Sequence, residues 1–575
     1  MKSCTTARQA NGPLKNGAGS EPHRANPGRN SSRKVPVPIF QHAAERRRAD
    51  DGLPVAHLPD TTSTLRRAAR FIWLCLGLCL LAPGCARAPA TTQSPGETTW
   101  DSCYVHGEKV GYVKTTIRNI EQGARALLEI ETHSQIDIRR FGDTNQMDIR
   151  TTSVETPVGE VRHFTVTTKM GKDPIIIRGE VVGPELQLET EQAGKTETSS
   201  MPWQTETKGF QGIEQSLERD PMQAGEVRRL ALLVPVANQV IVADVELEAQ
   251  RQETTRLLDG SQDLLHIDCQ LTPTGAKGKG IQTVLWTDQW GKTVKTFVPG
   301  IEQEGFRTTE ALALEPSQAL RFDLETDMVV KVDRTLPPPF QTRCIRYRVV
   351  LDNDDPAALF SETSNQHVTK AGANVAEIVV TAPRYDHATP ANGVAATQDT
   401  VKKEAPPTPD DLSPNHMLQC DDPTIVAMAR EARGKAQDPL AIARALEIYV
   451  HRTVSSKNFS QVFATALEVA RSREGDCTEH AVLLAALARA CEVPARVVVG
   501  LVYVPSKQGF GYHMWTEIFD GQQWLPFDAT LGQGGIGASH LELGDSNLKD
   551  AAALTSLISV VQVLGKLKIE VLEVE

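Results

Sequence analysis

The hydrophobic pattern of this chain changes its period part-way along, and that change constrains the possible fold more than any other feature. Between residues 100 and 380, apolar and polar residues alternate in short segments such as 127–131 (LLEIE) and 244–248 (DVELE). Alternation with period two is typical of strands that bury one face, and glycine-bearing turns separate these segments. We therefore predict an antiparallel β-rich region over residues 95–385, built as a barrel-like or sandwich module.

Helical spacing replaces this alternation in the C-terminal part of the chain. Residues 386–421 are rich in Ala, Thr, Pro, Asn and Asp, as expected of a linker. Beyond them we expect helices near 423–434, 438–454, 462–472 and 477–490, strands near 495–504, 511–519 and 523–528, a helix near 548–563 and a strand near 567–573. Helices followed by antiparallel strands predict an α+β domain over residues 422–575.

Length and charge agree with a multidomain protein. The chain has 575 residues, which exceeds one compact core, and its 40% hydrophobic and 23% charged residues are ordinary for a globular protein. Residues 1–70 carry 13 Lys and Arg against 5 Asp and Glu, although the whole chain has a net charge of −11. The remainder is therefore acidic, which argues against nucleic acid as a partner.

The N-terminal segments predict export. Residues 1–70 form a basic leader without apolar periodicity, expected to be disordered, and a wrongly assigned start codon explains it as well as a cytoplasmic tail does. Residues 71–90 contain an apolar run that follows Arg66, Arg67 and Arg70. The run is shorter than the roughly 20 residues of a bilayer span. We predict a signal peptide.

A cysteine closes this apolar run. Residues 81–85 (LAPGC) resemble a bacterial lipoprotein box, although Ala82 stands where that motif usually has a branched residue. Cleavage near residues 88–90 and an uncleaved anchor are the alternatives. We expect an exported protein that is periplasmic or anchored to the membrane by a lipidated Cys85.

Cys477 is the first candidate catalytic residue. Asp476 and Glu479 flank it with the spacing of a capping box, which places Cys477 in the first turn of a helix. The helix dipole favours an anion there. With a cationic neighbour, the pKa of such a thiol can fall from about 8.5 to about 3.5–7.5. Taken alone, the residue also fits a buried structural cysteine.

A predicted hairpin brings a base and a carboxylate together. The dipeptide 520–521 (DG) favours a two-residue type I′ turn, which would pair Phe519 with Gln522. This register, which a loop opened to four residues would keep, places His513 directly across from Asp528, with Cβ atoms about 4.5–5.5 Å apart. The carboxylate could then accept one imidazole N–H and leave the other ring nitrogen facing a thiol.

Acyl transfer also needs donors for the developing oxyanion. The backbone N–H of Cys477 is the natural first donor, and Asn458 and Gln461 are candidates for the second. Trp515 shares a strand face with His513, where it could wall an acyl pocket or pack in the core.

A zinc site is the competing interpretation, because Cys, His and Asp are all metal ligands. The gaps between Cys477, His513 and Asp528 are too long for the close ligand pairs of structural zinc sites, and only Cys477 with His480 makes one such pair. We predict no metal and no cofactor, and we place His480 on the helix near the mouth of the site.

Four segments, taken in order, resemble the transglutaminase-like superfamily: 475–481 (GDCTEHA), 493–500 (VPARVVVG), 512–517 (YHMWTE) and 524–530 (WLPFDAT). The resemblance implies a papain-like α+β core with Cys477 as nucleophile, His513 as base and Asp528 as the carboxylate that orients it. The stretch before these segments, including residues 463–466 (FATA), resembles exported bacterial proteins of this group, which also carry a long β-rich N-terminal region.

One departure from that family affects the expected chemistry. Cross-linking transglutaminases typically use a tryptophan upstream of the cysteine as an oxyanion donor, and this chain has no tryptophan between Trp290 and Trp515. We expect cysteine-dependent acyl transfer on amide or peptide bonds of a protein or peptide substrate in the cell envelope, with hydrolysis at least as favoured as cross-linking. The alternative is a non-catalytic envelope binding or scaffolding module that keeps the fold.

Overall fold

The computed structural model describes residues 96–575, apart from gaps at 123–124, 141, 170–173, 193, 237–238, 275–279, 318–319, 324–328, 353, 384, 386–403, 457–463, 550–562 and 564. The predicted leader, the signal peptide with Cys85, the first half of the predicted linker, most of the predicted helix near 548–563, Asn458 and Gln461 lie outside the described residues. Among the residues described, no helix combines the length and the apolar character needed to cross a membrane.

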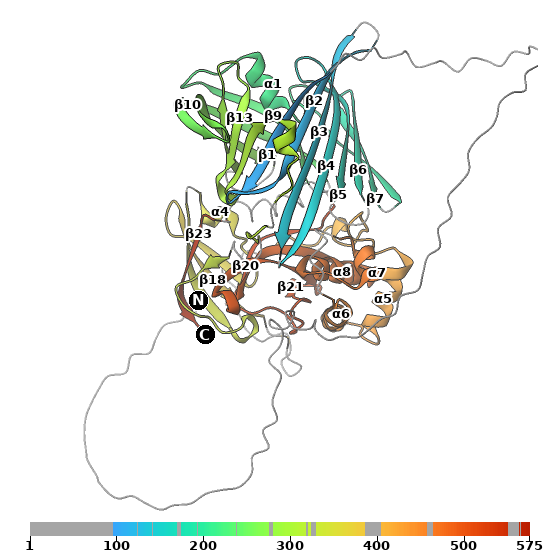
Figure 1. Ribbon diagram of the computed structural model, residues 1–575. Helices are drawn as coiled ribbons and strands as arrows, with labels where there is room; N and C mark the ends of the chain where they lie inside the picture. The colour runs from blue at the N-terminus through green and yellow to red at the C-terminus, as the bar shows by residue number, and fades with distance from the viewer. Residues whose placement is uncertain are drawn as a thin grey trace, which may run out of the picture. The chain divides into compact units, whose positions relative to one another are not determined.

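The N-terminal region is one 14-stranded sheet of antiparallel neighbours, which confirms its predicted β-rich character (Figure 1). Its order is β8-β7-β6-β5-β4-β3-β2-β1-β14-β13-β12-β11-β10-β9. The strands are β1 (Glu97–Val105), β2 (Glu108–Gln122), β3 (Arg125–Arg140), β4 (Asp143–Glu155), β5 (Val161–Lys169), β6 (Ile175–Val182), β7 (Glu185–Gln192), β8 (Lys195–Pro202), β9 (Val227–Val236), β10 (Gln239–Leu257), β11 (Gly260–Pro273), β12 (Ile281–Thr287), β13 (Thr293–Val298) and β14 (Gln303–Thr308).

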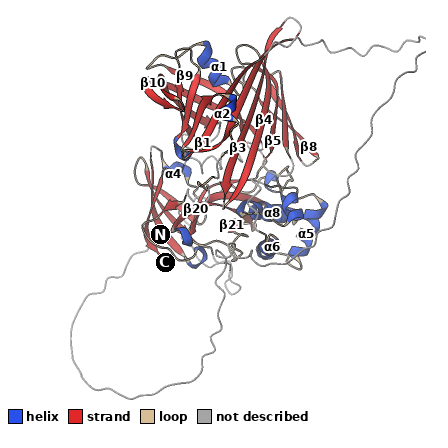
Figure 2. Cartoon of the chain, viewed as in Figure 1, coloured by secondary structure: helices blue, strands red, loops and turns tan. Residues whose placement is uncertain are grey.

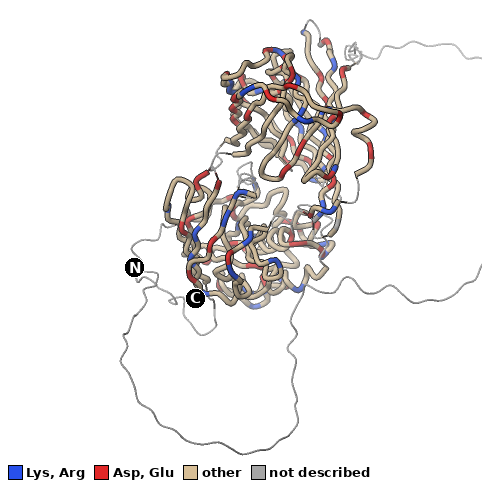
Figure 3. Tube along the Cα trace, turned by 60° about the vertical axis from the view of Figure 1, so that its left-hand side comes forward, with Lys and Arg blue, Asp and Glu red and all other residues tan. Residues whose placement is uncertain are grey.

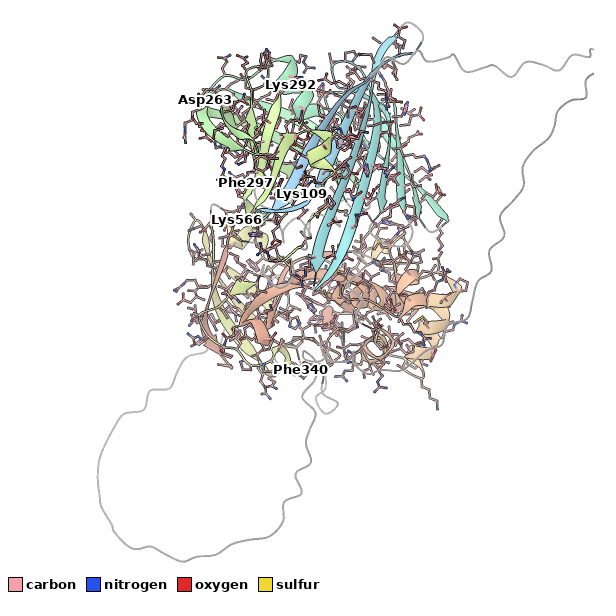
Figure 4. The ribbon with its side chains drawn as sticks, in the orientation of Figure 1. Lys109, Asp263, Lys292, Phe297, Phe340 and Lys566 are labelled. Atoms are coloured by element: carbon pink, nitrogen blue, oxygen red, sulfur yellow. The ribbon has the colours of Figure 1, made fainter. Side chains whose placement is uncertain are left out.

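The alternating residues of this sheet divide between a buried and an exposed face, as predicted. On β10, Val245 and Leu247 are buried whereas Glu246 and Glu248 are exposed. Helix α1 (Gly212–Arg219) covers part of the buried face through Leu217. Side chains stand out from both faces in Figure 4, and Figure 3 shows acidic and basic residues interspersed along the strands.

The C-terminal part holds two smaller sheets. One has the order β15-β20-β19-β22, with β21 paired to β20, and the other has the order β17-β18-β16-β23. The strands are β15 (Val330–Lys331), β16 (Cys344–Leu351), β17 (Gln366–Lys370), β18 (Val375–Thr381), β19 (Ala495–Val504), β20 (Gly509–Phe519), β21 (Trp524–Phe527), β22 (His540–Ser546) and β23 (Leu567–Val574). Because β15 pairs with β20 and β16 with β23, this core also uses residues from the N-terminal side of the predicted linker.

Helices gather beside these strands (Figure 2). They are α5 (Pro423–Arg433), α6 (Pro439–Thr453), α7 (Ala466–Ser472) and α8 (Cys477–Ala490), and they lie within the predicted helical ranges. Short helices elsewhere are α2 (Glu310–Ala313), α4 (Pro356–Leu359), η1 (Pro299–Ile301), η2 (Pro339–Gln341), η3 (Pro409–Asp411) and η4 (Pro505–Lys507). Helix α8 is buried on all sides and packs among the other three helices, β19 and β20, so it forms the centre of the core. Strand β22 was not predicted.

Candidate active site

Cys477 is the first residue of α8, and the predicted capping box is confirmed. Oδ1 of Asp476 accepts the N–H of Thr478 at 2.8 Å, while Oε2 of Glu479 accepts the N–H of Asp476 at 2.8 Å. Oε1 of Glu479 also accepts the N–H of Ala464 at 3.0 Å. These bonds fix the helix start, and Cys477 lies half-buried against the main core.

A hydrogen bond joins the first turns of α8 to the strand that carries His513. The hydroxyl of Thr516 on β20 donates to the carbonyl oxygen of Ala481 at 2.9 Å. Ala481 lies one helical turn after Cys477, and Thr516 lies three residues after His513. The N-terminal half of α8 and the strand β20 are therefore held together.

His513 and Asp528 form a buried pair. Nε2 of His513 lies 2.8 Å from Oδ2 of Asp528, and the side chains are 8% and 0% exposed. The second carboxylate oxygen, Oδ1, accepts the N–H groups of Thr530 and Leu531 at 2.9 and 3.2 Å. An ionised carboxylate only accepts, so Nε2 of His513 carries the proton and Nδ1 keeps its lone pair.

The predicted two-residue hairpin turn is wrong. Phe519 pairs with Trp524 instead of Gln522, so the turn has four residues. Oδ1 of Asp520 accepts the N–H groups of Gln522 and Gln523 at 2.7 and 2.8 Å, which stabilises the longer turn.

The change of register moves the pairing by two residues and explains why the contact survives. His513 no longer lies directly across from Asp528, and β21 already ends at Phe527. Because side chains alternate with period two, a shift of two residues keeps Asp528 on the same face. It then reaches His513 along the diagonal of the hairpin.

A second imidazole, which the sequence analysis missed, shares the same carboxylate oxygen. Nε2 of His540 lies 3.2 Å from Oδ2 of Asp528, and its Nδ1 lies 3.2 Å from the carbonyl oxygen of Gly537. Burial alone would raise the pKa of Asp528, but His513 and His540 outweigh it, and the pKa lies well below its usual value of 3.8. The carboxylate is therefore ionised. The alternation of His540 and Glu542 with leucines was the signal for this strand.

Glu447 is a second buried group that the sequence analysis missed. Its Oε1 accepts the N–H groups of Gly534 and Gly535 at 3.2 and 3.1 Å, in the loop that follows Asp528. Burial raises the pKa of Glu447 to about 8, and the charge of Asp528 adds to the effect. The signal was a charged residue on the apolar stripe of α6, with Ala443 four residues earlier.

Trp515 and His480 are buried. The ring of Trp515 lies 6.3 Å from that of His513 and 5.3 Å from that of His540, and it also belongs to a small core cluster with Val498. Nδ1 of His480 lies 2.6 Å from the carbonyl oxygen of Asp476. His480 is 2% exposed, so its predicted place at the mouth of the site is wrong.

The two histidines and the carboxylate could also be considered as metal ligands. One ligand atom from each of His513, Asp528 and His540 lies within 4.8 Å of the others, and all three residues are buried. The two hydrogen bonds to Oδ2 of Asp528 account for this spacing without an ion.

A comparison with protein families identifies the part of the chain that carries the site. Residues 426–529 match the family model of the transglutaminase-like superfamily. They form a transglutaminase-like domain. This domain includes Cys477, His513 and Asp528, whereas His540 lies beyond the matched range.

Solved structures show a limited likeness. A candidate cysteine protease from Cytophaga hutchinsonii is 18% identical, with a TM-score of 0.24, and the match covers 40% of this chain and 86% of that chain. A β-barrel-like protein of a domain of unknown function from Brucella abortus is 9% identical, with a TM-score of 0.26, over 37% of this chain and 96% of that chain. No curated protein matches this sequence.

Proposed function

We propose that the transglutaminase-like domain is a cysteine-dependent acyltransferase or amide hydrolase with a papain-like α+β core. The observation that carries the proposal is the buried hydrogen bond between His513 and Asp528, on a strand held against the helix that begins at Cys477. A nucleophile, a base and a carboxylate that orients the base are the components of an acyl-transfer triad.

In the first half of the reaction, His513 takes the thiol proton at Nδ1 and the Cys477 thiolate attacks the carbonyl carbon of a substrate amide. A C–S bond forms and the C–N bond breaks, while the imidazolium returns the proton to the departing nitrogen. Ammonia or an amine leaves, and a thioester remains. Asp528 stabilises the imidazolium through the bond at Nε2.

In the second half, water or an amine attacks the thioester carbonyl. His513 removes a proton from the attacking group, and the C–S bond breaks as that proton passes to the sulfur. Water yields a carboxylic acid, and an amine yields a new amide. The stretch without tryptophan between Trp290 and Trp515 supports hydrolysis at least as strongly as transfer.

We propose a protein or peptide substrate in the cell envelope. The apolar run within residues 71–90 supports export, and the cysteine box at 81–85 supports lipidation of Cys85. The net negative charge of the chain beyond residue 70 supports a partner other than nucleic acid.

The test is alkylation of the full chain by iodoacetamide between pH 5 and pH 9, with each cysteine followed by peptide mass spectrometry. We expect Cys477 to react at pH 6 at least about tenfold faster than a free thiol with a pKa of about 8.5. His513→Ala should slow the reaction greatly. His367→Ala, at an exposed histidine bonded to Glu362, is the matched control and should leave the rate unchanged.

A rate for Cys477 no higher than that of a free thiol would refute the enzyme. If Cys477 reacts at the expected rate but the Cys477→Ala variant leaves cellular function unchanged, the scaffolding alternative would be favoured. Stoichiometric zinc in the purified protein would favour a metal site. Acyl adducts trapped on Cys477 in an envelope extract would identify the substrate.

A further inference from the structure

The carboxylate of Asp528 is shared between two imidazoles. Its Oδ2 lies 2.8 Å from Nε2 of His513 and 3.2 Å from Nε2 of His540. His540 is 2% exposed and comes from β22, which pairs with β19 and not with the strand of His513. A catalytic triad requires only the contact between its base and its carboxylate. Here a second histidine, from a separate strand, also contacts that carboxylate.

The surroundings of His540 determine which of its ring nitrogens carries the proton. Burial lowers the pKa of His540, so near pH 7 the ring is neutral and has one N–H. Its Nε2 faces an ionised carboxylate, and its Nδ1 faces the carbonyl oxygen of Gly537 at 3.2 Å. A lone pair against a full negative charge is repelled more strongly than a lone pair against a carbonyl dipole. The proton therefore belongs on Nε2, which donates to Asp528.

We infer that His540 is a positioning residue, which holds the Asp528 carboxylate and draws off part of the negative charge that Asp528 offers to His513. This inference rests on the proposed function for its catalytic meaning. A second donor on one oxygen weakens that oxygen as an acceptor for the first, so the His513 imidazolium is less stabilised. The base then returns its proton to the leaving nitrogen more readily.

Few other charged groups face this cluster among the described residues. Asp528 and His513 are the titratable groups that act on His540. The charge of Asp528 also acts on Glu447 of α6, and Trp515 packs against the His540 ring with 5.3 Å between ring centroids. Glu447 is present in the wild type and in every variant, so the comparison between them isolates the removal of His540.

The test is a set of NMR titrations of the full chain with isotope-labelled histidines. His540→Phe fills the space with a ring that has no donor, and the His513 ring should titrate about one pH unit higher. His540→Gln keeps an N–H donor and should give a smaller shift. The matched control is Ser539→Ala, because Oγ of Ser539 is buried, lies next to His540 in sequence and has no hydrogen-bond partner among the described residues.

In the wild-type protein, the nitrogen shifts of His540 should show a proton on Nε2 near pH 7. A proton on Nδ1 alone would overturn the inference, and this observation needs no variant. An unchanged His513 titration in folded His540→Phe would also overturn it, as would an equal shift in Ser539→Ala. If His540→Phe does not fold, His540→Gln and the wild-type spectrum decide.

Alkylation of Cys477 in the same wild-type sample separates this inference from the proposed function. A shifted His513 titration with an unreactive Cys477 would refute the enzyme and leave the coupling of the two histidines in place. A reactive Cys477 with an unshifted His513 would keep the enzyme and refute the role of His540.

Discussion

Replacing Asp528 by Asn should remove most of the reactivity of Cys477 while it changes the side-chain volume very little. Oδ1 of Asp528 accepts two backbone N–H groups, and Oδ2 accepts from both imidazoles. An amide has only one oxygen. If that oxygen keeps the two backbone bonds, the amide N–H₂ group points at His513 and His540, which must then accept.

The forced change of tautomer determines the size of the effect. Nε2 of His513 becomes an acceptor, its proton moves to Nδ1, and the ring presents an N–H to the thiol of Cys477 and cannot take its proton. A hydrogen bond to a charged group is worth about 1.5–3 kcal/mol, which is about 10- to 150-fold in rate. Loss of the correct tautomer adds to this, up to about 10⁴-fold in comparable triads. We expect a loss of at least about 100-fold.

The assay is the second-order rate of Cys477 alkylation at pH 6 and pH 7.5, with near-ultraviolet circular dichroism to verify the fold. Asp520→Asn is the matched control, because Oδ1 of Asp520 accepts only backbone N–H groups and an amide oxygen can replace it. Asp520→Asn should react like the wild type. A rate for folded Asp528→Asn within threefold of the wild-type rate would refute the assigned role of the carboxylate.

Two further predictions concern groups around Cys477, His513 and Asp528. Glu447 has a pKa of about 8 in the folded protein and about 4.5 when unfolded, so between these pH values the folded state holds the extra proton and the free energy of unfolding falls as the pH rises. Glu447→Gln should remove that part of the pH dependence, on the order of a few kcal/mol, in urea unfolding from pH 5 to pH 9, and equal slopes for both proteins would contradict this. Asp476→Ala should cost about 1 kcal/mol through loss of the N-cap and also slow alkylation of Cys477, as thermal unfolding and labelling would show. Asp422→Ala removes the N-cap of α5 and should cost as much stability without affecting labelling, so equal labelling of both variants would exclude a role for the Asp476 cap.

Local signals in the sequence were sufficient for most helices and strands of the C-terminal domain. The capping box at Asp476 and Glu479 predicted the start of α8, because its hydrogen bonds join residues only two or three positions apart. The apolar periods predicted α5, α6, β19 and β20 for the same reason, since each period is visible within one element. The predicted turn length of the hairpin was wrong. The side-chain hydrogen bonds of Asp520 stabilise a four-residue turn, which the dipeptide at 520–521 alone did not indicate.

The sequence by itself determined most elements of the C-terminal domain, the helix start that carries Cys477, and the face of the hairpin on which His513 and Asp528 lie. Only the tertiary structure decided what surrounds that pair. His540 reaches Asp528 because β22 pairs with β19, and Glu447 reaches the following loop because α6 packs beside β20 and β21. Such contacts depend on how whole elements pack, and the energy of packing is spread over a core that no short segment encodes.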